Sequence, residues 1–96
     1  MALVASGMLR PGEAGYMDVT LRGQVPYEVF VHPDEPGVDF DLSVFDESGN
    51  LIAQDTDTAS DAVCVITPAW TGPFRLVVNS ARGSSTYRTM VMELGA

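Results

Sequence analysis

The chain has 96 residues, of which 46% are hydrophobic, and this is the composition of one small folded domain rather than of a disordered segment. Its 13 acidic and 5 basic residues give a formal net charge of -8, which argues against binding to nucleic acid or to an anionic membrane surface. A single cysteine excludes an intrachain disulfide and a multi-cysteine zinc cluster.

Clusters of turn-forming residues divide the chain into short runs in which apolar and polar residues alternate with a period of two. This alternation is typical of strands with one buried and one exposed face. We expect strands at residues 3–9, 16–21, 25–31, 39–45, 51–53, 62–66, 74–79 and 87–94. No run keeps apolar residues at helical spacing over three turns, so no long helix is expected. About seven or eight antiparallel strands predict an all-β protein with two packed sheets.

The alternation also predicts which side chains form the core. The run at 62–66 is apolar on both faces and therefore favours a central strand. In the last run, Met90 and Met92 leave the inward face undecided. The expected core positions are Val19, Leu21, Val29, Phe40, Leu42, Val44, Val65, Phe74, Leu76 and Val78.

A family pattern is recognisable in the middle of the chain. The stretch DFDLSVFDESGNLIA at 39–53 resembles the D-x-D-L-x-(apolar)-x-D-x-x-G-N-x-(apolar)-A core of bacterial pre-peptidase C-terminal (PPC) domains. Segments 6–21, 67–78 and 83–91 are similar to other parts of the pattern, in the same order, so the resemblance spans nearly the whole chain. The chain departs from the family where the usual Asp-Tyr pair is reduced to Tyr16-Met17.

This resemblance implies a fold and a class of function. The fold would be a single jelly-roll-like β-sandwich domain over residues 1–96. The function would be that of a non-catalytic accessory domain of a larger, exported bacterial protein, which assists secretion or binds a protein or a polysaccharide. Some relatives, the collagen-binding modules of clostridial collagenases, bind collagen and Ca²⁺. The alternative is a stand-alone structural or assembly domain that mediates protein–protein contact, and the oligomeric state stays open.

Residues 1–7 lack the basic and apolar regions of a secretory signal. The residues themselves therefore leave two interpretations open, a cytoplasmic protein or a part of a longer exported precursor. The family resemblance implies a secreted, extracellular location.

Five aspartates form the candidate metal site. Asp39 and Asp41 share one face of a predicted strand, and Asp55, Asp57 and Asp61 lie in the following loop region. Carboxylate oxygens are the ligands that Ca²⁺ prefers, so Ca²⁺ is the one cofactor considered. The segment 55–61 lacks the glycine and the closing glutamate of an EF-hand. Alternatively, these carboxylates form a solvated acidic surface.

Three further residue types have candidate roles. Trp70 lies in a loop flanked by proline and glycine, where its ring either binds a ligand or plugs one end of the sandwich. His32 is the sole histidine, and no serine lies in a nucleophile-elbow sequence, so we predict no catalytic residue and no enzyme activity. Cys64, within an apolar run, is expected to be a small buried side chain.

Overall fold

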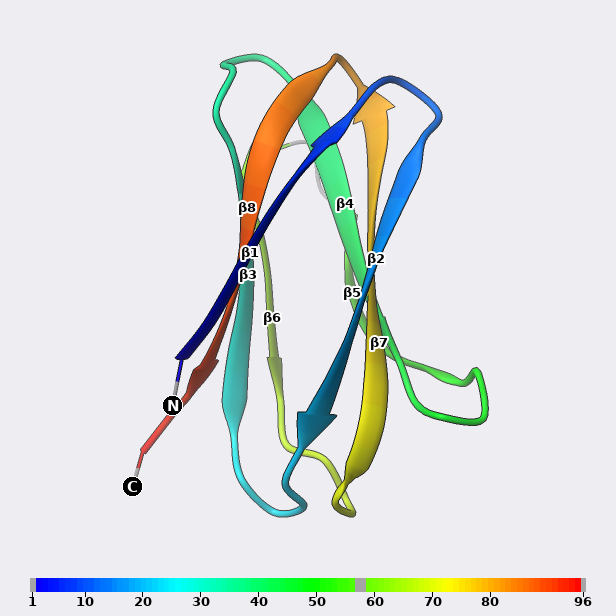
Figure 1. The fold of residues 1–96 in the computed structure, drawn as a ribbon, viewed down its shortest axis with the longest axis vertical. Coiled ribbons are helices and arrows are strands. Elements are labelled where there is room, and N and C mark those ends of the chain that lie inside the picture. The colour runs from blue at the N-terminus through cyan, green and yellow to red at the C-terminus, as the bar shows by residue number, and fades with distance from the viewer. Residues whose placement is uncertain (1, 57–58, 96) are drawn as a thin grey trace.

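In a computed structural model the chain forms two four-stranded antiparallel sheets that pack face to face (Figure 1). The structure describes residues 2–56 and 59–95. Within these residues there is no helix, and hence none long and apolar enough to cross a membrane. The strands are β1 (Ala2–Leu9), β2 (Ala14–Leu21), β3 (Tyr27–Pro33), β4 (Asp39–Phe45), β5 (Leu51–Asp55), β6 (Ala62–Ile66), β7 (Gly72–Arg82) and β8 (Ser85–Glu93).

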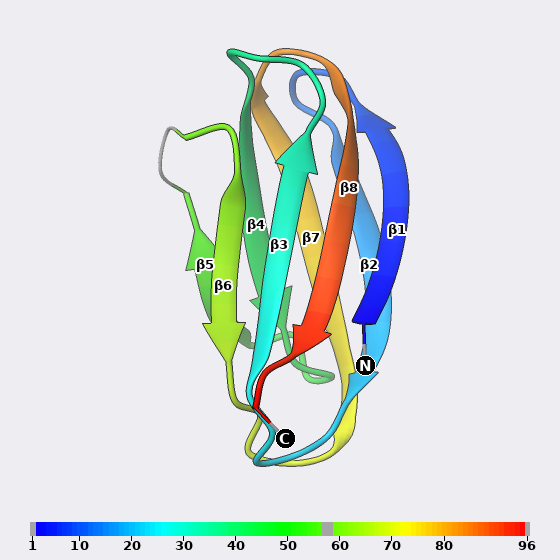
Figure 2. The same cartoon turned by 90° about the vertical axis from the view of Figure 1, so that its left-hand side faces the viewer.

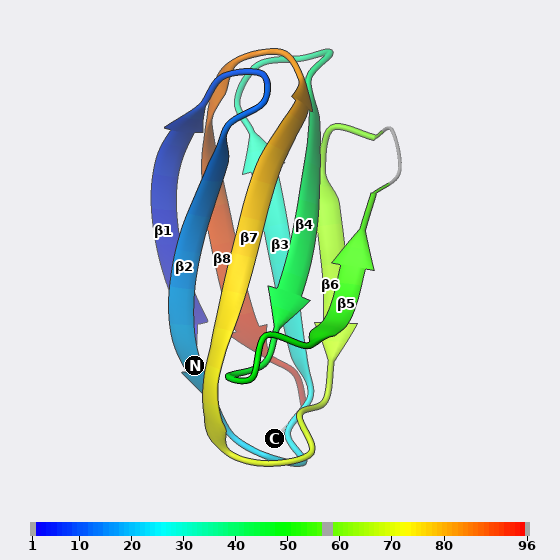
Figure 3. The same cartoon turned by 90° about the vertical axis from the view of Figure 1, so that its right-hand side faces the viewer.

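The all-β sandwich expected from the sequence is confirmed. Sheet A has the strand order β1-β8-β3-β6 (Figure 2), and sheet B has the order β2-β7-β4-β5 (Figure 3). Every connection except the β4–β5 turn crosses from one sheet to the other. Each predicted run became a strand, although the run expected at 25–31 begins at Tyr27 and continues to Pro33.

The core lies between the two sheets. It is formed by the inward-facing side chains of strands in which buried and exposed residues alternate. All predicted core residues are buried except Val65, which is 62% exposed. That prediction is wrong because Val65 points to the outer face of sheet A, opposite Glu28 of β3. The expected central strand is also wrong, because β6 is an edge strand of sheet A. Its small residues Ala62 and Cys64 face the core, while Val63 and Val65 face outward.

Tyr87 of β8 fills the side of the sandwich between β1 and β2. Its ring makes an edge contact with Phe40, with the centroids 5.6 Å apart and the planes at 75°. Its hydroxyl lies against Gly7 and Gly15, and a Cβ atom at Gly7 would stand 2.9 Å from that oxygen. Two glycines are therefore required where the edges of the two sheets approach each other. The inward face of β8 is thereby assigned to Tyr87 and its alternate neighbours, and Met90 and Met92 lie on the outward face.

Candidate functional site

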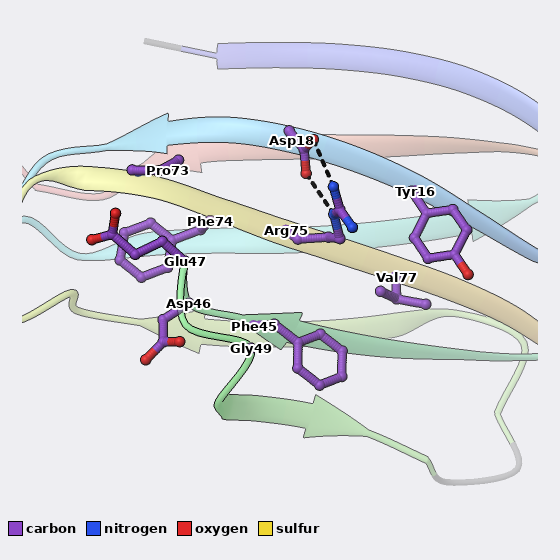
Figure 4. Close-up of a pocket in the computed structure, with 10 residues that line it drawn as sticks. All are labelled: Tyr16, Asp18, Phe45, Asp46, Glu47, Gly49, Pro73, Phe74, Arg75 and Val77. Atoms are coloured by element: carbon purple, nitrogen blue, oxygen red, sulfur yellow. Dashed lines mark hydrogen bonds and ion pairs between the residues drawn. The ribbon is translucent and has the colours of Figure 1, made fainter.

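A groove of about 640 Å³ crosses the outer face of sheet B (Figure 4). Strands β2, β7 and β4 form its sides and floor, and the β4–β5 turn forms one end. The antiparallel register places Asp18, Arg75 and Phe45 on one face, because Asp18 lies opposite Arg75 and Arg75 lies opposite Phe45. The lining residues are Tyr16, Asp18, Phe45, Asp46, Glu47, Gly49, Pro73, Phe74, Arg75 and Val77.

Tyr16 and Arg75 form one wall of this groove. Tyr16 is 68% exposed, and the guanidinium carbon of Arg75 lies 5.7 Å from the centroid of its ring. Arg75 Nε and Nη2 donate hydrogen bonds to Asp18 Oδ1 and Oδ2 over 2.8 and 3.2 Å. These bonds lower the pKa of the Asp18 carboxyl and raise the pKa of Arg75, so both groups are ionised at neutral pH. An exposed ion pair adds little stability, and here it keeps the Arg75 guanidinium beside the ring of Tyr16, which stays accessible.

The floor and one end of the groove are apolar and aromatic. Phe45 and Val77 project from adjacent strands onto the floor, as Figure 4 shows. Trp70, in the loop before β7, is 44% exposed and stacks on Phe74 with the ring centroids 6.1 Å apart. Its Nε1 donates a hydrogen bond to Glu47 Oε1 over 3.2 Å. Trp70 thus contacts two lining residues, one of them the buried Phe74, and remains partly exposed beside the groove.

The turn at the end of the groove is held by Asp46, which is buried. Its Oδ1 accepts hydrogen bonds from the backbone N–H groups of Ser48 and Asn50, both over 2.9 Å, and its Oδ2 accepts one from Asn50 Nδ2 over 3.1 Å. The backbone hydrogen bond from Asn50 is the largest cause that lowers the pKa of Asp46. Asp46 is therefore a structural residue of the turn rather than a free ligand group.

Two of the five predicted calcium ligands lie side by side on sheet B. Asp39 and Asp41 are both half-buried on the outer face of β4, as the sequence predicted. Asp39 Oδ1 has almost no exposed surface and accepts no hydrogen bond within the part of the chain that the structure describes. A buried carboxylate oxygen without a donor favours a cation or water beside it.

The other predicted ligands lie elsewhere or outside the described residues. Asp55 lies opposite Leu42, whose side chain faces the core, and its Oδ2 accepts a hydrogen bond from the Val63 N–H over 2.9 Å. Asp61 Oδ1 accepts a hydrogen bond from His32 Nδ1 over 2.7 Å. Asp57 is outside the described residues. Among residues 2–56 and 59–95, no three His, Cys, Asp or Glu side chains converge to hold a metal ion, and the described carboxylates alone supply fewer oxygens than the six to eight that Ca²⁺ takes.

His32 and Cys64 lie on the other sheet, away from the groove. The His32 ring is exposed on the outer face of β3 and stacks on Phe30, with the planes 8° apart. Cys64 is buried, as the sequence predicted, and burial, with a smaller contribution from the Asp55 carboxylate, raises the pKa of its thiol to about 11. A thiol with so high a pKa is a poor nucleophile at neutral pH.

The sequence reasoning did not select Tyr16 and Arg75, although one signal for them was present. In the run 16–21 the core face is formed by Met17, Val19 and Leu21, so Tyr16 shares the outward face with Asp18. An aromatic residue on the polar face of an alternating strand indicates an exposed ring. The pairing with Arg75 on β7 could not be predicted, since it depends on which strands are neighbours.

Comparison with known proteins gives a match in structure. The structure of the pre-peptidase C-terminal domain of collagenase from Bacillus anthracis aligns with 93% of this chain and 87% of its own, at 18% sequence identity and a TM-score of 0.77. No family model and no curated protein matches the sequence. The chain therefore has the fold of a PPC domain, which is the fold that the resemblance in the sequence implied.

Proposed function

We propose that this chain is a non-catalytic accessory domain of a larger, exported bacterial protein, and that its groove on sheet B binds a protein or a polysaccharide. One observation carries the proposal: Tyr16 is held by Arg75 as an exposed aromatic wall above an apolar floor. Rigid aromatic side chains on an open, concave surface supply contact area at low entropic cost. None of the residues that line the groove is a histidine or a cysteine, and its three carboxylates, Asp18, Asp46 and Glu47, each accept a hydrogen bond from a neighbouring group.

The shape of the groove supports a polymeric ligand. It is open along the face of the sheet rather than enclosed, so a chain can lie across it with its ends in solvent (Figure 4). Tyr16 offers a stacking face, and the Asp18–Arg75 pair and Glu47 offer polar groups at the rim. The fold shared with a domain of a collagenase adds collagen to the ligands to be tested.

Co-sedimentation with insoluble polymers tests this proposal. The purified chain is mixed with insoluble collagen, cellulose or chitin, and the bound fraction is measured over a range of protein concentrations. We expect the wild type to bind one of these polymers and Tyr16→Ala to bind about tenfold more weakly, the loss typical of a central aromatic contact.

Val65→Ala is the matched control, because Val65 is 62% exposed but lies on sheet A. It should bind as the wild type does. Absence of binding to all three polymers, or equal binding by Tyr16→Ala and the wild type, would contradict the proposal.

A second candidate function, protein–protein contact in an assembly, is favoured by the outer face of sheet A. The register aligns Val4, Met90, Phe30 and Val63 in one row across all four strands of this sheet. Val4 and Val63 are 62% and 43% exposed, and such a row of apolar side chains is typical of a surface that contacts another protein.

A further inference from the structure

The four edge strands of the sandwich differ in how they are protected. Strands β6 and β1 are the edges of sheet A (Figure 2), and β2 and β5 are the edges of sheet B (Figure 3). An unprotected edge presents a row of backbone N–H and C=O groups to any other strand, so folded proteins usually block their edges.

Three of the edges carry such protection. Strand β6 has five residues, and the Asp55 carboxylate accepts the hydrogen bond of its Val63 N–H. Strand β5 also has five residues, and its pairing with β4 is shifted by an irregularity next to Phe45. Strand β2 carries a charged residue in its middle, Asp18. Short length, irregular pairing and charge all oppose the addition of another strand.

Strand β1 has none of these features. It has eight residues, ALVASGML, without a charge or a proline, and it pairs with β8 in an unbroken register from Ala2 to Leu9. On its outer face Val4 and Met8 are 62% and 53% exposed. A long, regular and apolar edge strand is a template for strand addition.

We propose that β1 pairs with β1 of a second copy of this chain, antiparallel and related by a two-fold axis, so that the two A sheets form one eight-stranded sheet. This contact lies on sheet A, away from the groove on sheet B, and does not depend on the proposed function. The second copy is the chosen occupant because the contact is self-complementary in side-chain pattern and brings no like charges close together.

The side-chain pattern fixes one register. In an antiparallel pair, opposed residues lie on the same face of the sheet, so outward residues must face outward residues. A two-fold axis at Ser6 places Val4 opposite the partner's Met8 and Leu3 opposite the partner's Leu9. Shifting the axis to Ala5 instead places Val4 opposite the partner's Ser6. The axis at Ser6 is favoured, because it covers the two most exposed apolar side chains of the strand with each other.

The charges permit this contact despite the net charge of -8. Strand β1 has no charged residue, and the first one after it is the cation Arg10. In the antiparallel pair each Arg10 lies four residues from the axis at Ser6, on opposite sides of it. At about 3.3 Å per residue, the two Arg10 residues are therefore about 26 Å apart. This is beyond the Debye length of about 8 Å at physiological ionic strength, so they do not repel each other appreciably. The single strand pair makes a small interface, and we expect a dissociation constant on the order of 100 μM.

Sedimentation velocity of the whole chain, from about 10 μM to about 1 mM, tests the pairing. We expect the wild type to shift from monomer to dimer over this range. Val4→Glu/Met8→Glu places two pairs of negative charges in the contact. Because like charges about 5 Å apart repel each other, this variant should dimerise at least tenfold more weakly than the wild type. Val4→Lys/Met8→Glu places Lys opposite the partner's Glu at both positions and should dimerise at least as well as the wild type.

Three further variants make the test specific. Thr20→Glu/Gln54→Glu adds the same two negative charges at exposed positions of sheet B and should dimerise as the wild type does. Ser6→Cys should form a disulfide-linked dimer on mild oxidation, because the axis brings the two thiols together, whereas Gln54→Cys should not. A wild type that is monomeric at about 1 mM would overturn the proposal. So would equal dimerisation of the two Val4/Met8 variants, or equal cross-linking of the two cysteine variants.

Discussion

At the scale of single residues, the carboxylates of this acidic chain have separate structural tasks. Asp46 accepts three hydrogen bonds inside a turn, Asp18 holds Arg75, and Asp55 accepts a hydrogen bond from the edge strand β6. A sequence pattern shows the charge of each aspartate but not its partner. Asp55 and Asp61 were predicted as calcium ligands for this reason, and the structure shows Asp55 bonded to Val63 and Asp61 beside His32.

The carboxyl of Asp46, which holds the β4–β5 turn, makes the free energy of unfolding depend on pH in acid. Its pKa is lower in the folded chain than the ordinary value of 3.8, so its contribution to the free energy of unfolding is present above that value. The contribution is lost as the pH falls through the lowered pKa of the folded state. Urea unfolding measured from pH 7 to pH 2 should show that Asp46→Asn is less stable than the wild type at neutral pH, and that the two converge in acid.

Glu35→Gln is the control for this comparison, since it removes one negative charge from an exposed loop residue. It should change the free energy of unfolding by little at any pH. A constant difference between Asp46→Asn and the wild type across the whole range would mean that the Asp46 charge does not stabilise the turn.

At the scale of strands, burial decides the effect of a substitution more than the residue type does. Leu42 of β4 is 0% exposed, whereas Val65 of β6 is 62% exposed. Leu42→Ala should lower the free energy of unfolding by about 2–5 kcal/mol, because it leaves a cavity in the core. Val65→Ala should lower it by less than about 1 kcal/mol, since it removes exposed surface contacts only.

Denaturant titration of both variants checks this prediction. A small loss in Leu42→Ala would show that β4 is not packed against the opposite sheet. A large loss in Val65→Ala would show that the outer face of β6 is covered, in contrast to its place at the edge of sheet A.

The strands could be predicted from the sequence to a greater extent than their order. Period-two alternation in 16–21 and 39–45 locates β2 and β4 and identifies their core faces, because burial on one side of a sheet imposes that period. The run 62–66 gives no such alternation, and for this reason the prediction of Val65 as a core residue is wrong: it lies on the outer face. Which strands are neighbours in a sheet depends on connections that cross the sandwich. Local sequence patterns do not show these connections. The groove was missed for the same reason, since Tyr16 and Arg75 come from different strands.

At the scale of the whole molecule, the negative charge is the property that a bound cation would change most. The folded chain carries a formal net charge of -8, and Asp39 and Asp41 are half-buried side by side on sheet B. Self-repulsion of this charge destabilises the compact state. A Ca²⁺ ion at these two carboxylates, with further oxygens around it, would relieve the repulsion.

We therefore expect millimolar Ca²⁺ to raise the melting temperature, and a chelator to reverse the effect. At about a hundred times its dissociation constant, a ligand that binds only the folded state stabilises it by about 2.7 kcal/mol. The increase should be absent in Asp39→Asn and present in Glu35→Gln. NaCl at matched ionic strength is the control for screening. Identical melting curves with Ca²⁺, NaCl and chelator would show that the acidic face is solvated and holds no calcium.

The pairing of Ala2 with Met92 has a mechanical consequence. It brings the two described ends of the chain to the same end of adjacent antiparallel strands (Figure 2). A tension applied through both ends therefore acts across the β1–β8 ladder, and its hydrogen bonds open one at a time rather than all together. Strands loaded in this way resist much less force than strands pulled past each other along their length. Under tension β1 would peel away first, and with it the edge that we propose joins two copies.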